Sequence, residues 1–182
     1  MKIEVNKRGT KEFYSEILYI TTKYNILKKK PNKKVQSIIK NRIIQIVVIS
    51  LLLPIYVDLY IKTNQWIYMF IIGAFFLIIF CLILTMININ KRINILINEK
   101  GTKTISIDEE KVSYKDESKE YNVKWENIET IIINKESISF LPKTILYPVI
   151  SLPTEYKDKV IETISKYKKE SLLVDNSDKY KK

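Results

Sequence analysis

Two long apolar stretches dominate the pattern of hydrophobic and polar positions along the chain. Residues 43–61 contain a single acid near their far end, and residues 66–89 contain no charged residue. At about 1.5 Å rise per residue, helices over these stretches would span roughly 28 Å and 36 Å, against a hydrocarbon core of about 30 Å. The pattern therefore predicts two transmembrane helices joined by an outer turn at residues 62–65.

The alternative to a membrane hairpin is a pair of helices buried in a soluble core. Core helices rarely stay apolar on every face over this length, and a chain of 182 residues is too small to enclose two of them. We also expect no cleaved signal peptide, because the apolar run begins late and no small-residue cleavage site follows it. The pattern favours a membrane-spanning hairpin.

Positive charges predict how the hairpin is oriented. Basic residues crowd the entrance to the first helix and follow the second, whereas the turn carries only Lys62. Under the positive-inside rule, we expect a multi-pass protein of the cell membrane with both termini in the cytoplasm. The residues expected to contact anionic lipid at the inner leaflet are Lys28, Lys29, Lys30, Lys33, Lys34, Arg42, Lys91 and Arg92.

Two residues inside the first apolar stretch have specific consequences. Asp58 lies four residues before Lys62, a spacing that predicts an ion pair at the outer rim rather than an ion-carrying site. Pro54 removes one backbone hydrogen bond and predicts a kink.

Ahead of the hairpin, residues 1–42 form the predicted cytoplasmic amphipathic helix and basic linker. A short alternating stretch at residues 2–5 can pair with a sheet, and Thr10 is placed to cap a helix. The helix would carry one apolar face, which could lie on the inner leaflet or pack on the later domain. That face comprises Phe13, Ile17, Ile20, Tyr24 and Leu27.

Behind the hairpin, the pattern changes from helical to alternating. An exit helix is expected over residues 90–101 and would end at Gly101, although alternation at residues 93–97 is also compatible with a strand. Residues 102–169 contain six short alternating runs and a closing amphipathic helix, which predicts a small antiparallel sheet that curls on itself. The polar tail at residues 170–182 is expected to be disordered.

Composition removes several classes of function. The net charge of +11 lies mostly beside the membrane, since residues 1–62 carry +9 and residues 91–182 carry +2. This placement favours anionic lipid, and no nucleic acid is expected as a partner. The chain has no histidine, and its one cysteine, Cys81, lies in the second apolar stretch. We therefore expect no disulfide, no metal or other cofactor, and no enzymatic activity.

A short pattern carries a family resemblance. Trp125 and Ile128 precede a pair of strands, and Pro142 and Lys143 follow before the closing helix. In this order the elements resemble the carboxy-terminal domain of the YcxB-like proteins, bacterial membrane proteins with a paired-helix anchor and a cytoplasmic domain similar to bacterial pleckstrin-homology-like (PH-like) folds. The resemblance implies an α+β membrane protein, in which a transmembrane helical hairpin precedes a small antiparallel PH-like β domain closed by a C-terminal helix.

The four residues of the pattern have two interpretations. Trp125 and Ile128 are candidates either for anchoring the sheet to its core or for contacting a partner. Pro142 and Lys143 are expected in a connection between strands, where Lys143 would meet solvent or an acidic lipid headgroup.

The leading functional hypothesis is a membrane-anchored, non-catalytic binding protein. Small membrane proteins with PH-like domains occur among the immunity proteins that protect producers of membrane-active bacteriocins, so the architecture suggests a peptide toxin as ligand. The alternative is a structural or regulatory subunit that partners another membrane protein. A pore-forming protein ranks third, because a pore has no need of an ordered β domain.

Overall fold

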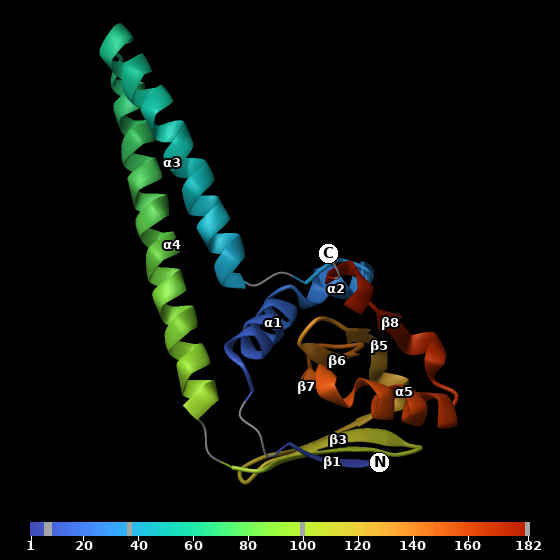
Figure 1. Ribbon diagram of the computed structural model, residues 1–182. Helices are drawn as coiled ribbons and strands as arrows, with labels where there is room; N and C mark the ends of the chain where they lie inside the picture. Colours follow the sequence, from blue (N-terminus) through green and yellow to red (C-terminus); the bar gives the residue numbers. More distant parts are fainter. Residues whose placement is uncertain (6–8, 36–37, 99–100, 181–182) are drawn as a thin grey trace. The chain divides into compact units, whose positions relative to one another are not determined.

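The computed structural model describes residues 1–5, 9–35, 38–98 and 101–180 (Figure 1). The chain divides into two compact units, one made of residues 36–95 and the other of residues 1–35 together with 96–182. We call the first the hairpin and the second the folded domain. The folded domain is discontinuous, because the hairpin is inserted within it.

The hairpin contains α3 (Ile38–Thr63) and all but the last three residues of α4 (Trp66–Asn98). Both helices are long and apolar enough to cross a membrane, and no side chain in the most apolar part of either helix is buried. The turn is shorter than predicted, because α3 continues to Thr63. Asn64, with φ 52°, then reverses the chain, a conformation that asparagine tolerates better than most residues.

Three predictions about the hairpin can be compared with the structure. Lys62 Nζ lies 2.7 Å from Asp58 Oδ2, which confirms the ion pair. Pro54 lies within α3, which continues to Thr63, and the kink at Pro54 stays a prediction. Residues 93–97 are helical, not a strand. The helix α4 extends to Asn98, and residues 99–100 of the predicted exit helix lie outside the described residues.

The folded domain contains two four-stranded sheets with strand orders β1-β2-β3-β4 and β7-β6-β5-β8. The sequence predicted a single curled sheet, but a 3₁₀ turn, η1 (Trp125–Asn127), separates β4 from β5 and divides the strands between two sheets. All pairs are antiparallel except β5 with β8. The strands are β1 (Lys2–Val5), β2 (Lys103–Ile107), β3 (Lys111–Lys115), β4 (Glu120–Lys124), β5 (Ile128–Ile133), β6 (Ser137–Pro142), β7 (Ile150–Pro153) and β8 (Leu173–Asp175).

One apolar core joins the two sheets and the closing helix. The predicted closing helix is α5 (Lys157–Lys166), preceded by the 3₁₀ turn η2 (Thr154–Tyr156), and it buries Val160 and Ile164. These side chains belong to the same cluster as Ile107 of β2 and Ile133 of β5. The predicted closing amphipathic helix is thus confirmed.

The N-terminal segment is part of this domain. Strand β1 pairs with β2, and the predicted helix forms as α1 (Lys11–Thr22) and α2 (Tyr24–Lys29), separated at Lys23. The hydroxyl oxygen of Thr10 accepts from Phe13 N at 3.1 Å, which confirms the cap. Of the two predicted placements, α1 takes the one on protein, because Glu16 Oε2 accepts from Ser137 Oγ of β6 at 2.8 Å.

The tail is ordered as far as Tyr180, so the prediction of disorder is wrong for residues 170–180. It forms the 3₁₀ turn η3 (Glu170–Leu172), β8 and the 3₁₀ turn η4 (Ser177–Tyr180). Polarity misled the prediction because these polar groups bind the backbone of the linker. Asn176 Nδ2 donates to the Pro31 carbonyl at 2.9 Å, and Tyr180 exchanges hydrogen bonds of 2.9 Å with Val35 N and O.

Candidate functional site

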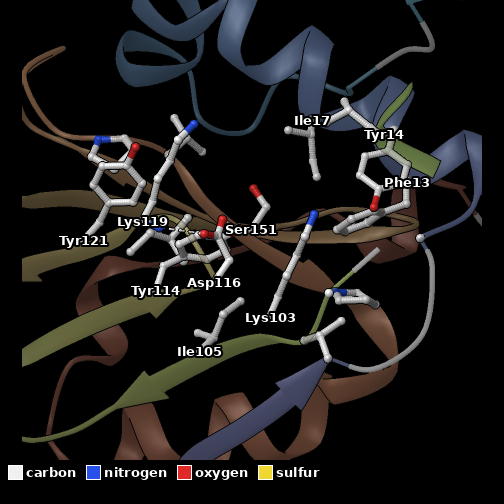
Figure 2. Close-up of a pocket in the computed structure, with 18 residues that line it drawn as sticks. Phe13, Tyr14, Ile17, Lys103, Ile105, Tyr114, Asp116, Lys119, Tyr121 and Ser151 are labelled. Carbon is white, nitrogen blue, oxygen red and sulfur yellow. Dashed lines mark hydrogen bonds between the residues drawn. The ribbon is translucent and has the colours of Figure 1, made fainter. Parts of the chain in front are cut away.

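A cleft of about 500 Å³ lies within the folded domain, between α1, the first sheet and the edge strand β7 (Figure 2). It brings together residues that are more than 100 positions apart in the sequence. The lining side chains used below are Phe13, Tyr14 and Ile17 of α1, Lys103 and Ile105 of β2, Tyr114 of β3, Asp116 and Lys119 of the following turn, Tyr121 of β4 and Ser151 of β7.

The walls of the cleft are largely aromatic and aliphatic. Phe13 and Tyr14 pack edge to face with ring centroids 5.2 Å apart, and both are buried against the domain. Tyr114 and Tyr121 are cross-strand partners whose ring centroids lie 6.1 Å apart. Aromatic side chains offer large contact area at low cost in side-chain entropy, which suits a binding surface.

A tight turn between β3 and β4 fixes the polar side of the cleft. Asp116 Oδ1 accepts from the backbone N–H groups of Ser118 and Lys119 at 2.8 and 2.7 Å, and Oδ2 accepts from the Tyr114 hydroxyl at 2.8 Å. These hydrogen bonds, the one from Ser118 N first, lower the pKa of Asp116 to about 2. Its carboxylate therefore stays ionised at neutral pH and holds Tyr114 and Lys119 in place.

Two ammonium groups give the cleft a positive balance. Lys103 Nζ lies 5.9 Å from the centroid of the Tyr14 ring, within the range of a cation–π interaction. Lys119 is exposed, and Figure 2 shows its side chain extending from the turn beside Tyr121. These two ammonium groups face one carboxylate, Asp116, among the lining side chains named above, so the cleft suits a ligand that combines apolar groups with an anionic one.

Strand β7 contributes the hydroxyl group of Ser151 to the cleft. Its Oγ lies 2.8 Å from Ser139 Oγ across the β6–β7 pair, so the hydroxyl is part of the sheet's own hydrogen bonding. Strand β7 stands at the edge of its sheet, with β6 as its partner in the described part of the chain. An edge strand that borders a cleft can pair with an extended peptide.

The predicted pattern residues lie outside the cleft. Trp125 and Ile128 are buried, and Trp125 Nε1 donates to the Asp108 carbonyl at 2.8 Å. Their position supports the core-anchoring interpretation. Pro142 is the last residue of β6 and not part of a connection, and its carbonyl accepts from the Tyr24 hydroxyl, whereas Lys143 is exposed in the loop that follows.

The predicted lipid-contact residues are divided between the two units. In the folded domain, Lys28 Nζ donates to the Lys143 carbonyl at 2.6 Å, and Lys34 Nζ lies 4.9 Å from the centroid of the Tyr180 ring. The side chains of Lys29, Lys30 and Lys33 are exposed. In the hairpin, Arg42 Nη1 donates to Gln45 Oε1 at 2.9 Å, and Lys91 and Arg92 are exposed on α4.

Sequence reasoning missed the cleft almost entirely. One local signal was present, because Asp116 followed by Ser118 and Lys119 is typical of a turn that an aspartate side chain closes. That signal fixes a turn but says nothing of α1, which supplies the opposite wall although it precedes the hairpin in the sequence. Comparison of the chain with protein-family models, curated proteins and solved structures gives no match.

Proposed function

We propose that this chain is a membrane-anchored, non-catalytic binding protein whose ligand enters the cleft between α1, the first sheet and β7. The observation that carries the proposal is the cleft itself, with aromatic walls, two lysines and a carboxylate already hydrogen-bonded within its own turn. The long apolar hairpin supports the anchoring part of the proposal. Aromatic walls with a few placed polar groups are the usual composition of a ligand site.

The chemistry of the cleft favours an apolar peptide segment that carries a carboxylate. Tyr14, Tyr114 and Tyr121 would pack against its side chains, and Lys103 and Lys119 would face the anionic group. Membrane-active peptides have such apolar segments. We therefore propose more specifically that the protein gives immunity to a peptide of this class. The resemblance to YcxB-like proteins supports the same architecture and adds no chemistry.

Charge reversal at Lys119 tests the binding role. Replacing Lys119 by glutamate should reduce protection of a sensitive host by about tenfold in inhibitory concentration, because a carboxylate at the rim repels an anionic ligand. The measurement is growth under a panel of membrane-active peptides, each with either a free carboxy terminus or an amide, at protein levels matched by immunoblotting.

Lys124→Glu is the matched control, because Lys124 is exposed on the same sheet but does not line the cleft. Cells that make this variant should tolerate the peptides as well as cells that make the unchanged chain. Equal sensitivity of expressing and non-expressing cells to every peptide would contradict the immunity proposal. Equal protection by both variants would contradict the assignment of the cleft.

The discontinuous domain supports the proposed topology. Residues 1–35 and 96–182 fold together, so a hairpin that crosses the membrane must leave both flanks on one side. The positive charges then favour the cytoplasmic side. In a Cys81→Ser background, a cysteine at Gln65 should react with an impermeant thiol reagent from outside intact cells, whereas a cysteine at Ser165 should react only after lysis. Labelling of Ser165→Cys in intact cells would contradict this topology.

A groove between the hairpin helices favours a second candidate function, that of a subunit in a membrane complex. Its volume is about 320 Å³, and Ile43, Ile46, Ile83 and Ile87 are among the residues that line it. Asn90 Oδ1 is enclosed at this groove without a hydrogen-bond partner among the described residues. A polar helix from another protein would satisfy it. Stable co-purification of one membrane protein in mild detergent, lost in Asn90→Leu, is the result expected of a subunit.

A further inference from the structure

The loop between β6 and β7 exposes two adjacent aliphatic side chains. Ile145 is 81% exposed and Leu146 is 86% exposed, the highest values among the large apolar residues of the described chain, the hairpin included. Isolated apolar residues on a surface are ordinary, but two neighbours at the tip of one loop form a single protruding apolar surface. We call residues 143–147 the apolar loop.

The base of the apolar loop is held by the domain. Lys143 N donates to the Asn127 carbonyl at 2.7 Å, and Tyr147 packs against the main apolar core. Since both ends of the loop are fixed, Ile145 and Leu146 project from an ordered base. Their exposure is therefore a property of the fold and not of a loose terminus.

Lysines lie beside the base of this loop. The hydrogen bond from Lys28 Nζ to the Lys143 carbonyl joins the end of α2 to the loop, and Lys29 and Lys30 continue from it with exposed side chains. Neither residues 17–35 nor residues 137–149 contain an acid. An apolar tip with lysines behind it matches an anionic bilayer, which offers acyl chains beneath negative headgroups.

We propose that the apolar loop inserts Ile145 and Leu146 into an anionic membrane surface while Lys29, Lys30 and Lys143 contact the headgroups. This inference rests on the proposed membrane anchoring and adds a second point of attachment. Contacts of this size bind weakly alone, but the hairpin holds the domain at a high effective concentration near the bilayer. A second copy of this chain would be a poorer partner for the apolar loop, because its lysines would face the lysines of the first copy.

The test places an environment-sensitive fluorophore on the full chain in lipid nanodiscs. In a Cys81→Ser background, NBD is attached at Leu146→Cys or, as the matched control, at Ser165→Cys on the exposed face of α5. Nanodiscs contain phosphatidylcholine alone or a mixture with phosphatidylglycerol, with and without doxyl-labelled lipid. Native Cys81, labelled in the unchanged chain, reports whether the hairpin itself is in the bilayer.

With phosphatidylglycerol present, the label at position 146 should show blue-shifted emission and quenching by doxyl lipid, and the label at position 165 should show neither. Adding Lys29→Glu and Lys30→Glu should reduce the quenching.

If Cys81 is quenched but position 146 behaves as position 165 does, loop insertion is wrong and anchoring stands. If Cys81 is not quenched, anchoring itself fails. Equal quenching at position 146 in uncharged nanodiscs would overturn the role of the lysines, and a blue shift without quenching would indicate a protein occupant instead.

Discussion

Replacing Trp125 by alanine is expected to destabilise the folded domain by about 3–5 kcal/mol, the usual loss for an aromatic side chain deleted from a core. The Trp125 ring packs near Phe140 with centroids 6.4 Å apart, and its side chain is only 5% exposed. The change also removes the donor to the Asp108 carbonyl. Since domains are stable by only about 5–15 kcal/mol, a large part of the stability would be lost.

Urea unfolding of the full chain in mild detergent, followed by circular dichroism, measures this loss. Trp125→Phe separates the two contributions, because it keeps an aromatic ring but not the hydrogen bond, and an intermediate loss is expected. Tyr121→Ala serves as the control, since Tyr121 is a partly exposed aromatic residue in the same protein and should cost less than about 1 kcal/mol. A stable Trp125→Ala variant that had lost only peptide protection would favour the partner-contact interpretation.

The folded domain should lose stability as the pH rises from about 5 to 8, and Glu16 should cause most of this loss. Burial against β6 raises the pKa of Glu16 from 4.5 to about 7, while hydrogen bonds from Ser137 and the Glu136 backbone partly oppose the shift. Between these two pKa values the folded state holds more protons than the unfolded state. The free energy of unfolding therefore falls through this window, by about 3 kcal/mol in total at 1.36 kcal/mol per unit.

Glu16→Gln should remove this dependence. The amide oxygen still accepts from Ser137, no charge forms, and the variant should match the unchanged chain at pH 5 and exceed it by about 3 kcal/mol at pH 8. Glu12→Gln on the same helix is the control, because Glu12 is exposed. Urea titrations at the two pH values give the difference. Parallel pH profiles for the unchanged chain and Glu16→Gln would show that another group is responsible.

Local patterns predicted the elements better than their assembly. The hairpin followed from unbroken apolar runs, and the alternation around Ile105, Val112 and Val123 located strands that bury these three side chains. The Thr10 cap and the buried stripe of α5 were equally local. Each of these depends on residues close together in the sequence, where period and capping chemistry are decisive.

The parts that depend on distant partners were not predictable in this way. The tail looks disordered because Asn176, Lys179 and Tyr180 are polar, and only the linker backbone, some 145 residues earlier, explains their order. Glu16 in the sequence is one charged position on a helix, and its burial depends on Ser137. The cleft needs α1 and β7 side by side, a juxtaposition that no single stretch of sequence records.

Insertion of the hairpin within the folded domain also determines when the domain can form during synthesis. Strand β1 and α1 leave the ribosome before the hairpin, yet their partners β2 and β6 follow only after about a hundred residues, once the hairpin has been made. Until then, the apolar face of α1 has no sheet to cover. If the hairpin spans the membrane as we propose, both of its helices must cross before the domain can be completed, because only then do the two flanks of the hairpin lie on the same side. A chain in which one helix failed to cross would leave the domain unfolded and open to proteolysis.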